Sequence, residues 1–395
     1  MHSQPKTIWN KNFIIAFMGY FFLFMTVSLF FLFPLLLKQF GASESRVGLI
    51  MGINSLVVIF IRPLFGRLID IYGRKKISLL GIIILIIIFP FFLLIKNAGW
   101  LPLLLRALTG IGWGISMTAT MTMCSDLAPA ERLAHSMGII GIGGLTSQAL
   151  GPFIGEEIIR KFGFNGLFLT CIIFVLGSFL CIYFTPEPMN FIPSQNKKSE
   201  KKLVKPHILI FVIICALPLI HGAVRGTIVY FITLFIKSIN LQRVGPFFVA
   251  FSLAAVGTRL GIGDISDRYG RKKVIFPAVI IICLNLLLIT QIQSLLMIII
   301  TGLIGGFGQG LLFPALSTYI IDFLGHENKG FAISLYLTLF DIGIGIGSPI
   351  FGRISDSYGF KTMYIIASIL LFSVALVFTL KAPEPKKRFI DSLQK

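Results

Sequence analysis

An eleven-residue segment occurs twice in this chain, and the two copies lie half a chain apart. Residues 66–76 read GRLIDIYGRKK and residues 263–273 read GDISDRYGRKK, so seven of the eleven positions are identical. The offset of 197 residues is half of the 395-residue length. Each copy separates two long apolar runs, which is the pattern of a membrane protein built from two similar halves.

The composition indicates that lipid surrounds this chain. It is 56% hydrophobic and 13% charged, and a soluble protein of this length could not bury so much apolar surface. The net charge of +19 does not predict a nucleic-acid partner, because the charges lie in short loops between apolar runs. They indicate topology and contacts with anionic membrane lipids. The five cysteines have no metal-ligand spacing, so we expect no metal site.

Apolar runs of about 20 residues, the length that crosses a bilayer, recur along the whole chain. Twelve spans are predicted, at residues 13–37, 47–66, 77–95, 101–123, 134–158, 164–185, 208–236, 246–263, 274–291, 295–323, 330–352 and 362–380. A polar, lysine-rich stretch at residues 186–207 separates the first six from the last six and is typical of a flexible linker. The sequence therefore predicts an all-α membrane protein with two pseudo-symmetric six-helix bundles, residues 1–185 and 208–395.

The distribution of lysine and arginine predicts the orientation. With the N-terminus inside, the cytoplasmic segments hold 22 of these residues and the outer loops hold nine. Positive residues favour the cytoplasmic side, so both termini, the linker and both copies of the repeated loop are expected there. We predict a multi-pass protein of the cytoplasmic (inner) membrane, with no cleavable signal peptide because the first apolar run is too long.

Several motifs resemble those of the major facilitator superfamily of transporters, and the resemblance covers essentially the whole chain. Residues 66–76 resemble the family's signature loop between helices 2 and 3, and residues 263–273 its repeat between helices 8 and 9. Arg106, with glycines at positions 110, 112 and 114, resembles a motif of helix 4.

Further resemblances favour the drug-efflux branch of this family. Residues 138–155 are similar to the helix 5 motif associated with antiporters, although Ser147 and Glu156 stand where glycine is usual. The opening WNKNF at residues 9–13 and the pair Arg62-Pro63 also resemble this branch.

The resemblance implies a cytoplasmic gate. In the family the repeated loops clamp the two halves shut on the inside, and the alternative is that they only anchor the topology. The gate residues would be Gly66, Asp70, Gly73, Arg74, Gly263, Asp267, Gly270 and Arg271. Asp126 and Asp322 follow later spans at a similar offset, and we expect them to pair with these basic loops.

Small residues recur along two predicted helices. Gly151, Pro152 and Gly155 belong to such a stripe in the fifth span, and Gly302, Gly306 and Gly310 form another in the tenth. Such stripes allow helices to pack backbone to backbone. The pattern fits either a helix-packing gate at Gly151, Pro152 and Gly155 or static packing.

Ionisable residues inside the spans are costly and therefore mark candidate functional positions. His221 and Arg225 share one helical face, and the resemblance places them with Arg106 along a central substrate cavity. Asp341 lies near mid-membrane and is expected either to carry a coupling proton, exchanged against Arg225 or His221, or to form a static ion pair within the second half. Glu156 and Glu157 are expected to face water.

The sequence predicts a proton-coupled secondary transporter of small amphipathic solutes, an exporter rather than an importer. It is expected to work as a monomer by alternating access, with the proton gradient as its energy source and no cofactor. The alternative substrate is an organic anion such as a carboxylate metabolite or siderophore. A membrane-embedded enzyme is a remote alternative, because the sequence shows no credible HExxH or GxSxG motif. A membrane sensor is equally remote, because it would not need two copies of the repeated loop.

Overall fold

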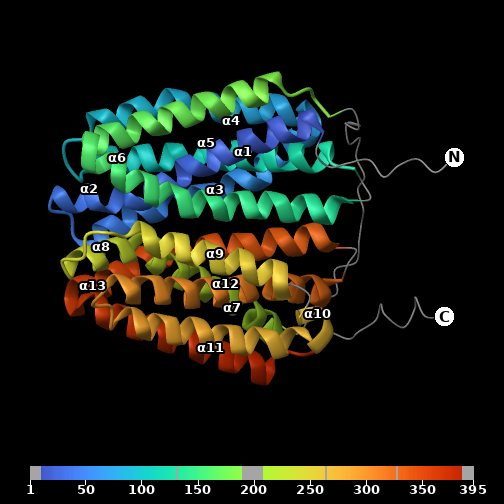
Figure 1. The fold of residues 1–395 in the computed structure, drawn as a ribbon. Coiled ribbons are helices and arrows are strands. Elements are labelled where there is room, and N and C mark those ends of the chain that lie inside the picture. Colours follow the sequence, from blue (N-terminus) through green and yellow to red (C-terminus); the bar gives the residue numbers. More distant parts are fainter. Residues whose placement is uncertain (1–9, 130–131, 189–207, 263–264, 326–327, 385–395) are drawn as a thin grey trace, which may run out of the picture.

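The computed structural model describes residues 10–129, 132–188, 208–262, 265–325 and 328–384, without the side chains of residues 133–134 and 267–268. Every regular element among these residues is a helix. The helices lie in two layers, with the first half of the chain above the second (Figure 1).

The first half contains six membrane-crossing stretches. They are formed by α1 (Lys11–Leu29), η1 (Phe30–Leu32) and α2 (Phe33–Gln39) in one rod, α3 (Glu44–Tyr72), α4 (Arg74–Ile88) with η2 (Phe89–Leu94), α5 (Trp100–Leu127), and the two limbs of α6 (Leu133–Phe184). The second half repeats this order. Its elements are α7 (Ile208–Gly226), the π-helix η4 (Thr227–Phe231) and α8 (Ile232–Ser238) in one rod, α9 (Gly245–Ile262), α10 (Ile265–Tyr269), α11 (Arg271–Ile289), α12 (Leu295–Leu324) and the two limbs of α13 (Lys329–Lys381).

Two pairs of predicted spans, 134–158 with 164–185 and 330–352 with 362–380, are joined by very short turns. Each pair is therefore described as the two limbs of one element, α6 or α13. The backbone of α6 turns at Gly163 (φ 66°) and that of α13 at Gly359 (φ 81°), a left-handed conformation that glycine adopts without a side-chain clash. Among the described residues, nine helices are long and apolar enough to cross a membrane. These nine, with α6 and α13 each crossing twice and α5 added, supply the twelve predicted crossings.

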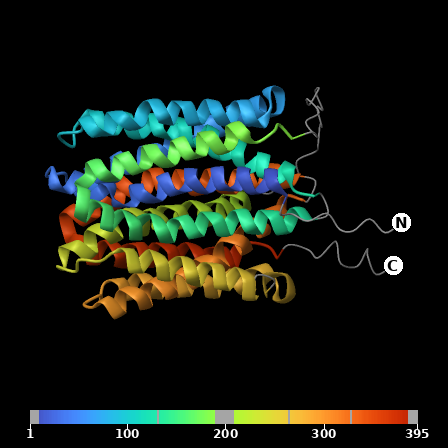
Figure 2. The same cartoon turned by 45° about the horizontal axis from the view of Figure 1, so that its top comes forward.

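The helices run roughly parallel between two ends of the molecule (Figures 1 and 2). One end carries Asn10 and Glu384, the first and last described residues, together with Gly73 and Gly270, and we name it the termini end. The opposite end carries the loop between α2 and α3 and the turns at Gly163 and Gly359, and we name it the far end. Each half therefore exposes a distinct set of loops at each end.

The glycine stripes lie in helix contacts within each half. A methyl group at Gly306 would overlap the backbone carbonyl of Phe251 in α9. In α6, a Cβ at Gly151 would lie 2.9 Å from the backbone carbon of Ser28 in α1, and one at Gly155 would lie 2.7 Å from Leu32. Backbone-to-backbone packing is therefore confirmed for the α12 stripe, while Gly151 and Gly155 pack beside α1 of their own half.

Candidate functional site between the two halves

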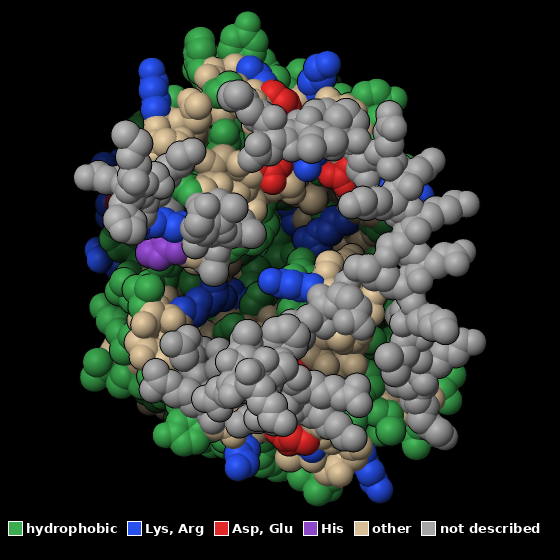
Figure 3. Space-filling model, turned by 90° about the vertical axis from the view of Figure 1, so that its right-hand side faces the viewer, with side chains coloured by type: hydrophobic (Ala, Val, Ile, Leu, Met, Phe, Trp, Pro, Cys, Tyr) green, Lys and Arg blue, Asp and Glu red, His purple; other side chains and the backbone are tan. Residues whose placement is uncertain are grey.

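A hollow opens at the termini end, between the upper and lower halves. Figure 3 shows Lys and Arg side chains around it and hydrophobic side chains in its depth. Across the interface α3 packs on α13 and α6 on α9. Close backbone approaches between the halves occur towards the far end, where Gly48 meets Ser348 and Gly245 meets Phe153.

An ion pair joins the halves inside the membrane. The Arg62 guanidinium of α3 donates to the carboxylate of Asp341 in α13. The side chains are 34% and 15% exposed, so the pair is shielded but still reachable by water. The expectation of a static ion pair within the second half was wrong, because the partner of Asp341 comes from the first half. Exchange of a proton against Arg225 or His221 stays a prediction. Arg62 lies opposite Asp341 because α3 and α13 pack side by side across the interface.

Arg225 and His221 reach different partners on the same face of α7. Arg225 donates to the amide oxygen of Gln148 in α6 at 2.9 Å and lies 4.4 Å from the ring centroid of Phe251. The Nε2 atom of His221 is 2.9 Å from the side-chain oxygen of Gln309 in α12. Arg225 is thus a second polar link between the halves, whereas His221 is held within its own half.

Arg106 is buried in the first half, with 3% of its surface exposed. Its guanidinium lies over the rings of Phe30 and Trp113, at 5.1 and 5.3 Å from their centroids. One nitrogen donates to the backbone carbonyl of Met51, while Nε and Nη1 have no hydrogen-bond partner among the described residues. Contact with aromatic faces stabilises a buried cation without a counter-ion.

Polar contacts continue across the interface beyond Arg225. The hydroxyl of Tyr230 in η4 lies near Ser55 in α3 and within electrostatic reach of Arg106, Arg225 and Asp341. Thr233 in α8 donates to the backbone carbonyl of Phe31 at 3.3 Å. Because η4 is a π-helical stretch, it turns these side chains out of the α-helical register. This local change was not predicted.

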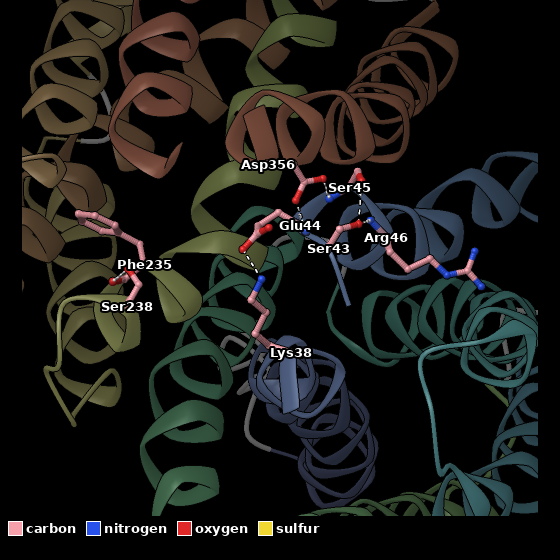
Figure 4. Close-up of polar contacts among 8 residues, drawn as sticks. All are labelled: Lys38, Ser43, Glu44, Ser45, Arg46, Phe235, Ser238 and Asp356. Atoms are coloured by element: carbon pink, nitrogen blue, oxygen red, sulfur yellow. Dashed lines mark hydrogen bonds and ion pairs between the residues drawn. The ribbon is translucent and has the colours of Figure 1, made fainter. Parts of the chain in front are cut away.

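Two carboxylates close the far end. Asp356 of α13 accepts the backbone N–H groups of Glu44 and Ser45 at the start of α3, at 2.6 and 2.9 Å. Figure 4 shows this carboxylate aimed at the first turn of α3, with Lys38 on the other side of Glu44.

The second carboxylate is Glu156 of α6. It accepts the backbone N–H groups of Val244 and Gly245 at the start of α9, at 2.8 and 2.7 Å. The expectation that Glu156 faces water was therefore wrong, because the start of α9 covers it. Glu157 pairs with Arg160 and is 46% exposed, so the expectation was correct for that residue.

A pocket of about 750 Å³ lies at the far end beside Glu156. Both halves contribute to its wall, including Lys38 and Arg160 from the first half and Lys237 and Arg243 from the second. This pocket lies at the far end, whereas the hollow opens at the termini end.

The repeated loops lie at the termini end, beside the hollow. Arg74 contacts Asp126 at 2.8 Å and Asp70 at 3.2 Å, and Glu187 accepts the backbone N–H groups of Arg74 and Lys75 at 2.5 and 3.0 Å. Glu187 lies just after the end of α6, at the start of the predicted linker, and the other four residues belong to the first half.

The repeat in the second half has the equivalent contact. Arg271 donates to Asp322 at 2.9 Å, so the predicted pairing of Asp126 and Asp322 with the basic loops is confirmed. Gly270 has a φ of 99° and lies beside Glu384. Gly263 and the side chain of Asp267 lie outside the described residues.

Comparison with known proteins identifies the class of this molecule. The sequence model of the Major Facilitator Superfamily matches residues 13–263 and 219–395. The chain therefore belongs to the major facilitator superfamily, and it is a multi-pass membrane transporter rather than an enzyme.

Among curated proteins, the chain is 25% identical to the multidrug resistance protein MdtG of Escherichia coli O81 (strain ED1a), over 94% of each chain. It is 24% identical to MdtG of Dickeya zeae (strain Ech586), over 94% of this chain and 95% of the other. Among solved structures, the nucleoside transporter NupG has a TM-score of 0.78 at 14% identity, covering 95% of this chain and 100% of the other. The D-xylose-proton symporter has a TM-score of 0.77 at 16% identity, over 95% and 98%. These two structures show the shared fold.

Sequence reasoning overlooked three residues of this interface, Gln148, Tyr230 and Asp356, and it expected a fourth, Glu156, to face water. Gln148 and Tyr230 are polar side chains in apolar spans, a signal that was present but not used. Glu156 and Asp356 are 200 residues apart, as are the helix starts that they contact. A search for acids repeated at this offset would have found them.

Proposed function

We propose that this chain is a proton-coupled secondary transporter that exports small amphipathic solutes across the cytoplasmic membrane by alternating access. The proton gradient supplies the energy, and no cofactor takes part. The protein works as a monomer among membrane lipids, with both termini and the hollow facing the cytoplasm. The Lys and Arg distribution supports this orientation, and the 25% identity to MdtG proteins supports export of drug-like solutes.

The ion pair between Arg62 and Asp341 is the observation that carries the proposal. Burial favours the protonated form of a carboxyl group, and a nearby cation favours the ionised form. In this conformation the carboxyl group of Asp341 is held by Arg62 of the other half. A proton arriving at Asp341 cancels its charge and breaks the pair, so proton binding changes how strongly the two halves hold together.

The test is flux into or out of reconstituted vesicles under an imposed pH gradient, with a panel of cationic dyes and polycarboxylates. Wild-type protein should move at least one solute in response to the gradient. Asp341→Asn should still exchange that solute but lose the response. Unchanged coupling in Asp341→Asn would remove Asp341 from the mechanism, and no gradient-driven flux of any solute would contradict proton coupling.

Organic-anion transport is the second candidate, and the buried arginines favour it. Arg106 and Arg225 are 3% and 7% exposed and lie against aromatic rings rather than carboxylates. A cationic site of this kind suits a carboxylate or another anion. Arg225→Ala should abolish binding of polycarboxylates only if the substrate is anionic, and should leave binding of cationic dyes in place if it is not.

A further inference from the structure

Two contacts of the same kind close the far end, and each joins one half to the other. In the first, the oxygens of Asp356 in the second half accept the N–H groups of Glu44 and Ser45 in the first half. In the second, the oxygens of Glu156 in the first half accept the N–H groups of Val244 and Gly245 in the second half. We name these two contacts the cross-half clasps.

The clasps are related by the internal repeat. Adding 200 to 44, 45 and 156 gives 244, 245 and 356, so every member of one clasp has its counterpart in the other. The acid comes from the second half in one clasp and from the first half in the other. The two contacts therefore cross the interface in opposite directions, as the pseudo-twofold relation of the halves requires.

Each clasp satisfies groups that a helix cannot satisfy by itself. The first N–H groups of a helix have no partner within it, and the helix start carries a partial positive charge. A carboxylate that accepts two of them forms charge-assisted hydrogen bonds. Both acids are partly shielded; the side chain of Glu156 is 16% exposed. These bonds can exist only while the far end is closed, since each acid and its helix start belong to different halves.

The surroundings of the two clasps are also alike. Lys38 pairs with Glu44 at 2.5 Å beside the first clasp. The Lys237 ammonium lies 3.9 Å from Glu156 in the second, and Arg243 is also within electrostatic reach of that carboxylate. A lysine near each clasp offsets the charge gathered there, which favours the ionised carboxylates that the contacts need.

We propose that Glu156 and Asp356 are positioning residues that set the balance between the closed and open states of the far end. This role goes beyond the proposed function, because it needs neither a substrate nor a proton. Releasing either clasp shifts the resting protein towards the state in which the far end opens and the termini end closes.

The test measures distances between spin labels at both ends, without substrate and at fixed pH. The labels are placed on a variant whose five cysteines are replaced by alanine. Lys161→Cys and Lys361→Cys report the far end, and Lys76→Cys and Lys273→Cys report the termini end; all four positions are exposed. Glu156→Gln and Asp356→Asn release one clasp each while keeping the side-chain shape. Glu157→Gln is the matched control, because this neighbouring acid pairs with Arg160 on its own helix.

Each clasp variant should raise the ratio of far-end-open to far-end-closed molecules about tenfold, the effect of a carboxylate at a helix start in a partly buried site. The far-end distance should lengthen as the termini-end distance shortens, and the control should match the parent. Each clasp is tested by its own variant. If one variant fails to fold, the far-end distance of the other still tests the proposal.

Far-end distances that stay the same in a folded clasp variant would overturn the proposal, as would an equal shift in Glu157→Gln. A failure here leaves proton coupling and export untouched, because no flux enters the measurement. Conversely, a chain that moves no solute could still show the expected shift in distances.

Discussion

The two ends of the molecule use the same contact in different ways. At the termini end, Glu187, which lies just after the end of α6, accepts two N–H groups at the start of α4 in the first half. At the far end, Glu156 and Asp356 accept two N–H groups each, and their partners belong to the opposite half. The chemistry is shared, but the first contact stabilises a half and the other two hold the halves together.

Glycines on α3 show the same contrast. Towards the far end, a methyl group at Gly48 would overlap the backbone carbonyl of Ser348 in α13, and one at Gly52 would lie 2.7 Å from the carbonyl of Gly345. Towards the termini end of the same helix, a methyl group at Gly66 would meet nothing within 4 Å. The interface is therefore tight at one end and open at the other, as the proposed alternating access requires of one of its states.

The largest effect is expected where backbones touch. In Gly48→Ala the added methyl group cannot fit against Ser348, and overpacking of this kind costs about 1–3 kcal/mol. The cost falls on the far-end-closed state, so labels at the far end should move apart. Gly66→Ala is the control on the same helix and should leave the resting distances as they are. If Gly48→Ala and Gly66→Ala gave the same far-end distance, the interface would not differ in tightness between its two ends.

The ion pair at the hollow should have a smaller effect on stability. Arg62 is 34% exposed and Asp341 is 15% exposed, so solvent screens part of their attraction and a coupling of about 1–2 kcal/mol is expected. A double-mutant cycle of Arg62→Gln and Asp341→Asn, followed by thermal unfolding in detergent, measures this coupling. If the two substitutions changed stability additively, the coupling would be zero and the ion pair would not hold the halves together.

A smaller effect still is expected at the termini end. Asp126→Asn removes the carboxylate that Arg74 contacts at 2.8 Å, a partly exposed contact within the first half. We expect a loss of about 0.5–1 kcal/mol of stability and no change in the far-end distance. A longer far-end distance in this variant would show that the two ends are coupled through the loop.

The smallest effect is expected for Glu157→Gln at the far end. Glu157 and Arg160 are 46% and 66% exposed and lie on one helix, so their pair contributes about 0–0.5 kcal/mol. Thermal unfolding of this variant should match wild type. A large loss of stability would show that any carboxylate at the far end stabilises the protein, and not only the two carboxylates of the clasps.

The local features of this fold could be predicted from sequence, and the contacts between the halves could not. Apolar runs of span length and two copies of one loop were enough to place the helices, because a bilayer leaves a chain few other solutions. The pairing of Asp126 with Arg74 was also accessible, since it lies within one half.

The corrected expectations concern contacts between the halves. Asp341 pairs with a residue 279 positions away, and Glu156 with a helix start 88 positions away. Such partners depend on how the two halves sit against each other, which periodicity and charge do not encode. The clasp residues repeat at an offset of 200, close to the offset of 197 between the two loops. This was the one sequence signal that pointed to the clasps.

A cross-link at the far end tests the central claim most directly. Lys38 of the first half and Lys237 of the second line the same far-end pocket. Lys38→Cys and Lys237→Cys, joined by a short reducible cross-linker, would hold that end closed. The account predicts that flux in vesicles stops when the link forms and returns when it is reduced, while either cysteine alone has no such effect. Undiminished flux through fully cross-linked protein would contradict transport by alternate opening of the two ends.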